Sequence, residues 1–375
     1  MNGIKHKKTN VEKKTLIDKI FKYFFLCVCI LCSAVIVLIV AFILIKGVQP
    51  FFKEYLINGK IYKISLLEFI FGNKWGFSPN HYGAGYIIIN TIYITILSLL
   101  IAVPVSVLTS LFITKTAPKK IGKGLQIVIE LLASVPSIIY GLFGQAVITK
   151  FVVKISEGIG VQTLGGQSVL STAIVLSMMI FPTITMISIN SIKAVKKELV
   201  LGSMALGASN TQTNFKVVLR SAKNGIFSGV ILGVGRALGE ATAVSKVCGN
   251  AQIGPSFNLF DTTGTITTTI LSGFNEASGV VYDIKFSLGV VLILIIIFSP
   301  LLIMLSVFRL SFVKHNSISL LVFISLPSID KITSPVLIPA FFAGDSMPFS
   351  VITSLIPITF TPFEYKENPT GIPPK

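Results

Sequence analysis

Two opposite charges interrupt an apolar run in the C-terminal half of the chain. In "GVILGVGRALGEATAV", Gly229 to Val244, Arg236 and Glu240 stand four residues apart. Side chains at this spacing share one face of a helix, so we expect the two to lie within reach of each other. A charge at the centre of a membrane-spanning helix costs about 2.5–3.5 kcal/mol on insertion scales, and it normally faces a bundle interior or an aqueous path.

The pair has two interpretations. The guanidinium of Arg236 offers a fixed fork of N–H donors that suits the oxygens of phosphate, and Glu240 would hold the arginine when no anion is present. On this interpretation, which we favour, both residues line a substrate path. The alternative is a self-neutralising pair that only holds two helices together.

The composition indicates that a membrane surrounds these charges. Of the 375 residues, 52% are hydrophobic and 13% are charged, and the mean hydropathy is +0.83, unlike an ordinary soluble domain. A helix needs about 20 residues to cross the hydrocarbon core. Six stretches are long and apolar enough: Tyr23–Ile45, Tyr86–Ile113, Leu125–Ile148, Val169–Ile192, Gly225–Val247 and Phe286–Phe308. We therefore predict an all-α membrane protein with six transmembrane helices.

The basic residues lie mainly between these stretches. The formal net charge is +17, and we assign it to membrane orientation and contact with lipid rather than to nucleic acid, because Lys and Arg in short loops set topology. Residues 1–22 form a basic arm, and the segments after the second and fourth stretches are also basic. We expect all three to face the cytoplasm, which places both ends of the six-span core there.

The sequence contains no recognisable constellation for catalysis or for a metal ion. Its histidines, His6, His81 and His315, are scattered, and Cys248 is isolated from the three cysteines of the first stretch. The G-x-x-x-x-G-K-[ST] motif that cradles nucleotide phosphates is absent. We expect no enzyme activity and no bound cofactor, so that ATP would be used by another chain.

The segment from Ser191 to Gly225 is long enough for two short amphipathic helices separated by a glycine. The apolar side chains expected to group together are Leu199, Met204, Ala205 and Leu206 in the first helix, and Phe215, Val218 and Leu219 in the second. Gly207 breaks the helix between them. Such an element is either an interfacial loop or a docking surface for a cytoplasmic partner.

This segment resembles the loop through which permease subunits of ABC importers engage their ATPase. That loop is usually written as E-A-A followed by a glycine. Leu201, Gly202 and Ser203 occupy the E-A-A place, and Gly207 occupies the place of the glycine. The chain departs from the family pattern at Leu201, which replaces the acidic residue, and at Arg220, which stands where the family commonly has proline. The resemblance implies that residues 193–224 couple the chain to an ATPase.

Two further stretches narrow the resemblance. They are "ELLASVPSIIYGLFG", residues 130–144, and "GRALGEATAV", residues 235–244, which is followed by "GNA" at 249–251. Together they resemble the phosphate permease of the PstC type, over about residues 15–309. The sister permease, of the PstA type, shares shorter forms of both motifs.

The resemblance implies a permease bundle of the type I ABC importer class over residues 23–310. It also implies four kinds of partner: a second permease of the PstA type, ATPase subunits of the PstB type, an extracytoplasmic phosphate-binding protein of the PstS type, and membrane lipid. Arg236 and Glu240 would line the translocation path for phosphate. The alternatives are the sister permease, an importer of another oxyanion, a proton-coupled secondary transporter that uses Glu240, and a membrane scaffold without transport.

Two prolines interrupt predicted spans. Pro136 lies in the third span and Pro182 in the fourth, where Thr183 and Thr185 offer hydroxyl partners. A proline breaks the hydrogen-bond ladder of a helix. We expect each to be either a gating hinge or a kink that serves packing alone.

The last segment has a different character. Residues 311–375 hold nine of the 17 prolines, too many for a seventh span, yet they are too hydrophobic for an ordinary disordered tail. We expect this tail to be poorly ordered, and to be either a lineage-specific extension or the product of a frameshift.

Overall fold

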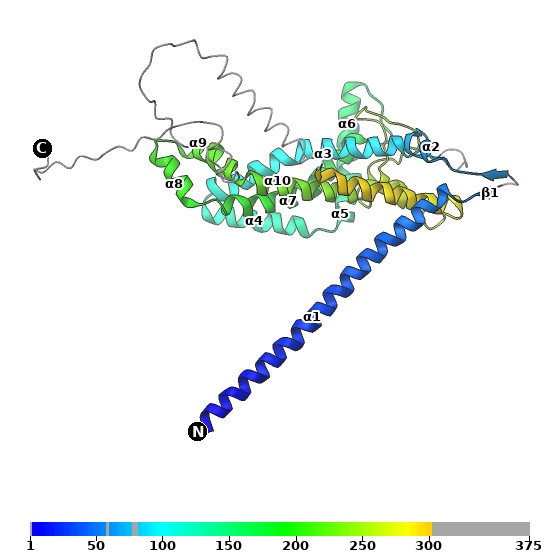
Figure 1. Ribbon diagram of the computed structural model, residues 1–375. Coiled ribbons are helices and arrows are strands. Elements are labelled where there is room, and N and C mark those ends of the chain that lie inside the picture. The colour runs from blue at the N-terminus through cyan, green and yellow to red at the C-terminus, as the bar shows by residue number, and fades with distance from the viewer. Residues whose placement is uncertain (1, 58–59, 77–81, 302–375) are drawn as a thin grey trace, which may run out of the picture. The chain divides into compact units, whose positions relative to one another are not determined.

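The computed structural model describes the backbone of residues 2–57, 60–76 and 82–301 (Figure 1). The tail of residues 311–375 and the end of the sixth expected span, residues 302–308, lie outside the described residues. Within the described part, six helices are long and apolar enough to cross a membrane. They are Asp18–Phe51, Gly85–Thr116, Ser137–Ile159, Val169–Lys193, Asn210–Gly239 and Val280–Leu301. The expected number of spans is confirmed.

Three neighbouring helices form the centre of the bundle. They are α3 (Gly85–Leu111), α7 (Val169–Lys193) and α10 (Leu219–Gly239), which pack against one another (Figure 1). The most apolar window of α7 is 67% buried, which is far more than any other span. Most side chains of α7 therefore face protein rather than lipid.

Glycines bring α10 close to α7. Gly225, Gly229 and Gly233 recur every four residues along α10, and a Cβ atom at Gly233 would lie 2.9 Å from the side chain of Ile184 on α7. Small residues at this spacing allow the backbones of two membrane helices to approach closely. The arrangement fixes the height of the last turn of α10, which carries Arg236, against α7.

The third span differs from the sequence expectation. Residues 125–148 do not form one continuous helix, because the chain is extended at Val135 and Pro136. Proline disfavours the helical conformation of the residue before it and supplies no backbone N–H. The elements on either side are α4 (Lys119–Ser134), then α5 (Ser137–Phe143), the π-turn η3 (Gly144–Ile148) and α6 (Thr149–Ile159). The membrane-crossing segment is Ser137–Ile159, so the expected span Leu125–Ile148 is wrong.

The fifth span also ends earlier than expected. Helix α10 stops at Gly239 rather than Val247, and the chain continues as an irregular segment to α11 (Ile266–Leu271). Carbonyl oxygens of this segment accept hydrogen bonds from the first N–H groups of α7, including Val169 N to Asp261 O at 3.0 Å. Those N–H groups have no partner inside their own helix. The irregular segment therefore caps α7.

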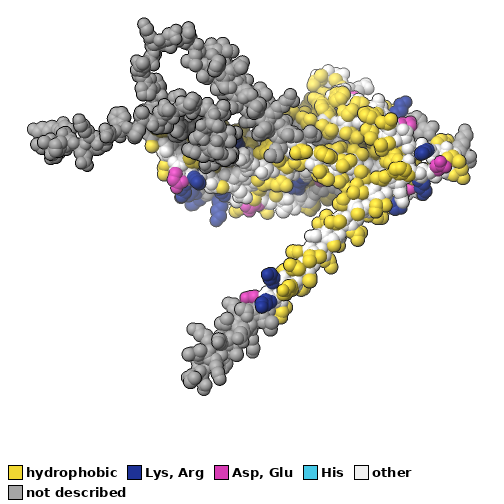
Figure 2. Space-filling model, viewed as in Figure 1, with side chains coloured by type: hydrophobic (Ala, Val, Ile, Leu, Met, Phe, Trp, Pro, Cys, Tyr) yellow, Lys and Arg dark blue, Asp and Glu magenta, His cyan; other side chains and the backbone are white. Residues whose placement is uncertain are grey.

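The first and last spans meet near one end. Helix α1 (Asn2–Val48), followed by the short turn η1 (Gln49–Phe51), contacts the helix Val280–Leu301, where Ser287 Oγ donates to Gly47 O at 2.6 Å. The most apolar window of α1 has no buried residue within the described part of the chain. Figure 2 shows a broad hydrophobic surface over the helices, with charged side chains mainly toward their ends. Such a surface suits a multi-pass membrane protein.

A small element joins the first span to the second. It contains the antiparallel hairpin β1 (Tyr55–Ile57) and β2 (Lys60–Tyr62), followed by α2 (Leu66–Phe71). The hydroxyl of Tyr55 donates to Asp283 Oδ2 at 2.8 Å, which ties the hairpin to the last span. Burial and the neighbouring carboxylate raise the pKa of Tyr55, so this hydroxyl stays a proton donor.

Candidate functional site

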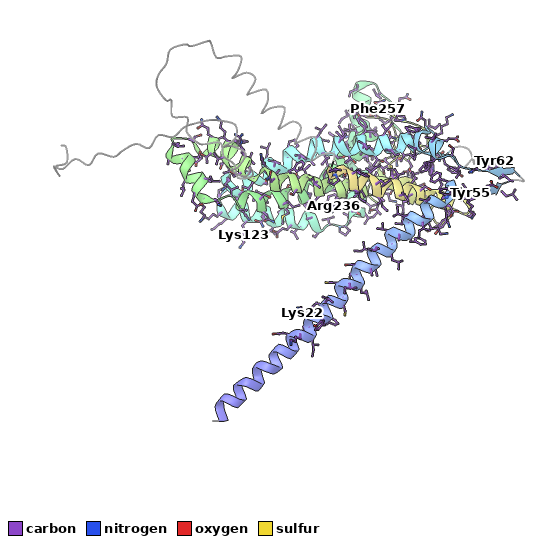
Figure 3. The ribbon with its side chains drawn as sticks, viewed as in Figure 1. Lys22, Tyr55, Tyr62, Lys123, Arg236 and Phe257 are labelled. Carbon is purple, nitrogen blue, oxygen red and sulfur yellow. The ribbon has the colours of Figure 1, made fainter. Side chains whose placement is uncertain are left out.

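Arg236 lies in the last turn of α10 and reaches across to α7. Its Nη1 atom donates to Thr183 Oγ1 at 2.8 Å, and both side chains are half-buried. Figure 3 shows Arg236 part-way along the bundle, between Lys123 toward one end and Tyr55 toward the other. The guanidinium has five N–H donors, so the bond to Thr183 occupies only part of its capacity. The remaining donors can bind an anion.

Glu240 does not share a helix face with Arg236, so this part of the sequence expectation is wrong. Glu240 is the first residue beyond α10, with φ −76° and ψ 120°. Its Oε1 atom accepts from the backbone N–H of Ala243 at 2.9 Å and from Thr242 Oγ1 at 2.9 Å. The four-residue rule requires that the helix continue, and here it ends at Gly239. The carboxylate shapes its own loop instead.

Glu240 stands where three elements meet. Thr242 Oγ1, which bonds the carboxylate, also lies 2.7 Å from Ser137 Oγ in the first turn of α5. Thr267 Oγ1 of α11 donates to the backbone oxygen of Glu240 at 2.7 Å. The sequence reading missed these hydroxyl partners, although Thr242 follows Glu240 by two residues. The structure thus links Glu240 to Pro136, the residue that precedes Ser137.

The two expected hinges have different surroundings. Pro136 separates two helices and is exposed, whereas Pro182 is buried inside a continuous α7. The expected break is therefore present at Pro136 and is not present at Pro182. Thr183, directly after Pro182, accepts the hydrogen bond from Arg236, while Thr185 Oγ1 donates to Phe181 O at 2.7 Å within its own helix.

Within the segment 193–224, which is expected to contact an ATPase, residues 194–218 lie between α7 and α10; we name them the docking loop after this expected role, and they have the expected helix–glycine–helix form. Helix α8 (Lys197–Ala205) ends before Gly207, which has φ +82°. Ser209 then begins α9 (Asn210–Thr213), and its side chain and that of Gln212 form a reciprocal capping box. Ser203 Oγ lies 3.0 Å from Thr213 Oγ1, which joins the two halves across the turn. Figure 1 shows α8 and α9 at one end of the bundle.

Apolar side chains of the docking loop are open to the surroundings. Leu201 is 65% exposed and Leu206 is 79% exposed, and Leu199 and Met204 are exposed as well. In the second short helix, Phe215 and Val218 were expected to lie in one apolar group. This is wrong, because Phe215 is exposed while Val218 is fully buried. The π-turn η4 (Asn214–Val218) changes the periodicity there.

A metal centre is not indicated within the described part of the chain. Among the residues whose side chains are described, 18–56, 61–76 and 82–301, no three His, Cys, Asp or Glu side chains are grouped so that they could hold a metal ion.

Six apolar helices, a charged site between two of them and an exposed docking loop together define a multi-pass membrane permease. The family described as binding-protein-dependent transport system inner membrane component matches residues 106–317. This chain belongs to that family. The resemblance to permease subunits of ABC importers, which the sequence of the docking loop indicated, is confirmed.

Several relatives share most of their length with this chain. It is 39% identical over 262 residues to the probable ABC transporter permease protein YqgH of Bacillus subtilis, which covers 68% of this chain and 80% of the relative. It is 33% identical over 242 residues to the phosphate transport system permease protein PstC of Pasteurella multocida, covering 61% and 75%. With PstC of Xylella fastidiosa the identity is 31% over 292 residues, covering 74% and 90%.

Among solved structures, a chain of a bacterial alginate ABC transporter is similar with a TM-score of 0.49 and 17% identity, covering 75% of this chain and 94% of that one. An inward-facing MetNI methionine ABC transporter is similar with a TM-score of 0.42 and 20% identity, covering 60% and 94%.

Proposed function

We propose that this chain is a PstC-type permease subunit of an ATP-driven importer, and that it forms half of the path by which inorganic phosphate crosses the cell membrane. The other half would be a permease of the PstA type. Two ATPase subunits of the PstB type and an extracytoplasmic phosphate-binding protein of the PstS type complete the assembly. ATP is used by the ATPase subunits, and this chain binds no cofactor.

One observation carries the proposal. A half-buried guanidinium, Arg236, is held on Thr183 inside the bundle of a chain that is 31–33% identical to proteins named as phosphate permeases. A charge in this position is costly in a membrane protein and normally marks an ion or substrate pathway. Its planar fork suits the oxygens of a tetrahedral anion.

Glu240 contributes through its loop. Its carboxylate bonds Ala243 N and Thr242 Oγ1, and this keeps the segment after α10 in place beside the path. We propose that this loop fixes the position of Arg236 relative to α5. A direct bond between Glu240 and Arg236 is not needed for this. Pro136, next to Ser137, would be the hinge about which α4 moves relative to α5, and Pro182 would shape α7 at Thr183.

The docking loop supplies the coupling. Its exposed apolar residues around Leu201, Gly202 and Ser203, with the turn at Gly207, would sit against the ATPase, so that ATP-driven closure moves α7 and α10. We propose accordingly that the docking loop and both ends of the six-span core lie in the cytoplasm. A secondary transporter would need no such contact.

The test is uptake of labelled phosphate into vesicles that contain the reconstituted assembly, with and without the ATPase subunits. We expect uptake that requires both the ATPase and ATP. Uptake that persists without the ATPase and collapses with the proton gradient would favour a secondary transporter. ATP-dependent uptake of sulfate in place of phosphate would assign the path to another oxyanion.

A further inference from the structure

A second polar region lies at the opposite end of the bundle from the docking loop. It is a cavity of about 510 Å³. The lining residues that matter here are Trp75, Asn250, Gln252, Glu276, Ala277 and Lys285. Neither Arg236 nor Glu240 lines it, so it is separate from the site described above.

The packing of α3 on α7 fixes the position of this cavity. The two helices run in the same direction, since Ser106 Oγ bonds Phe181 O and, further along, Leu111 clusters with Ile192. The cavity includes Tyr86 in the first turn of α3, whereas the docking loop follows the last turn of α7. Under the proposed orientation, the cavity opens on the extracytoplasmic side, where the substrate arrives.

Lys285 is the most unusual member of the lining. It is only 3% exposed, although lysine is almost never fully buried unless it is paired. Its Nζ atom donates to the backbone oxygen of Ser272 and lies 5.8 Å from the centre of the Phe274 ring. An ammonium group has three donors, so a neutral carbonyl oxygen leaves both its charge and further donor capacity available.

The acidic residues near Lys285 leave its positive charge available to an anion. Asp283, two residues away, accepts a hydrogen bond from Tyr55, and residues at this spacing do not face each other on a helix. Glu276, the other charged residue of the lining, is exposed, so water screens its charge. The buried positive charge therefore dominates the inner part of the cavity.

Another part of the cavity wall has an uncommon backbone conformation. Gly249 has φ +82° and Asn250, which lines the cavity, has φ +48°. Asn250 Oδ1 accepts from Cys248 Sγ at 3.2 Å, which orients the amide. Such conformations persist where the surrounding structure requires them and are frequent at ligand sites. Asn250, Gln252 and Trp75, which also line the cavity, are residue types whose side chains carry N–H donors.

We propose that this cavity is an entry site for inorganic phosphate, in which Lys285 binds the anion before it reaches Arg236. The inference rests on the proposed function and adds to it a second anion contact, at the end of the bundle opposite the docking loop. If Lys285 served only to hold the Ser272 carbonyl oxygen, replacing this lysine would not change the binding of phosphate in the cavity.

The experiment measures protection of a thiol placed in the cavity wall. Ala277→Cys is introduced into the full chain, in the assembled transporter in vesicles, and labelled with a membrane-impermeant maleimide in phosphate or in chloride of equal ionic strength. The chain without Ala277→Cys gives the background labelling of its own cysteines. We expect phosphate to slow the labelling of Ala277→Cys. Equal labelling rates in phosphate and chloride would overturn the site.

Three variants in the Ala277→Cys background test whether Lys285 is responsible for the protection by phosphate. Lys285→Met is expected to raise the half-protecting phosphate concentration about tenfold or more, as expected for the loss of a charge-assisted hydrogen bond. Lys285→Arg is expected to keep the protection, and so is Lys74→Met, which removes an exposed lysine outside the lining. Unchanged protection in Lys285→Met would overturn the role of the lysine. If Lys285→Met does not assemble, the phosphate and chloride comparison in Ala277→Cys and Lys285→Arg decides the proposal alone.

Uptake measured on the same vesicles separates this inference from the proposed function. ATP-dependent phosphate uptake without any protection would overturn the entry site and leave the importer intact. Protection that depends on Lys285, without ATP-dependent uptake, would support the site and contradict the importer.

Discussion

Arg236 of α10 and Thr183 of α7 are joined by a hydrogen bond of 2.8 Å from Nη1 to Oγ1. The bond crosses from α10 to α7, one turn beyond the place where Gly233 meets Ile184. It therefore holds a cation at a defined height between two helices. Among the described residues, the hydrogen-bond partner of Arg236 is a hydroxyl rather than a carboxylate, which orients its positive charge without neutralising it.

Removal of the Thr183 hydroxyl is expected to weaken transport without unfolding the chain. Thr183→Val leaves a half-buried N–H donor without its partner, at a cost of about 1–3 kcal/mol, and we expect phosphate uptake to fall about tenfold. Thr183→Ser keeps the acceptor and should retain most uptake. Thr185→Val is the matched control, because its hydroxyl bonds its own helix. An equal loss of uptake in Thr183→Val and Thr185→Val would contradict the role given to Thr183.

Substitutions of Glu240 separate a loop acceptor from a proton carrier. Its Oε1 atom accepts two hydrogen bonds, and Glu240→Gln keeps such an oxygen whereas Glu240→Ala does not. We expect the glutamine variant to retain most uptake and the alanine variant to lose about 1–3 kcal/mol of stability, measured as a lower Tm of the purified protein. Complete loss of uptake in Glu240→Gln with an unchanged Tm would instead indicate that the carboxylate carries a proton.

Two glycines of the docking loop should respond differently to alanine. Gly207 has φ +82°, and a Cβ atom there would meet nothing within 4 Å, so the cost of Gly207→Ala is that of the backbone, about 1–2 kcal/mol. Gly202 lies in helix α8 and is also open, so alanine there is expected to be neutral or favourable. We expect uptake to fall in Gly207→Ala and to persist in Gly202→Ala. The reverse order would show that the turn at Gly207 does not carry the coupling.

Much of this architecture follows from the sequence, because hydropathy and helix length alone fix the number of spans. The docking loop was also predictable, since Gly207 and the Ser209 capping signal are local. The ends of two helices, α4 before Pro136 and α10 at Gly239, were not predictable. The apolar residues on both sides of Pro136 resemble one continuous span, and Gly239 gives only a weak stop signal among four other glycines in α10. The hydrogen-bond partners of Arg236 and Glu240 depend on where these helices end. Thr183 also lies 53 residues from Arg236 in the sequence, so a local pattern does not indicate their bond.

Cys248 is expected to react slowly with thiol reagents. Its side chain is fully buried, and burial raises the pKa of the thiol. At pH 7–8 the reactive thiolate is therefore a smaller fraction than for an exposed cysteine, and labelling should rise as pH increases. Mass spectrometry of peptides labelled before and after denaturation in detergent measures the difference. Fast labelling of Cys248 in the native protein at pH 7 would contradict the packing of the segment that caps α7.

The most direct measurement is ATP-driven phosphate uptake by the reconstituted assembly with Arg236→Ala and Arg236→Lys, recorded together with ATP hydrolysis. We predict that uptake falls at least about 100-fold in the alanine variant, as expected when a charge-assisted anion contact is lost, and that it recovers only in part with lysine, which lacks the fork. Assembly and ATP hydrolysis should persist in both. Unchanged phosphate uptake in Arg236→Ala would contradict the account.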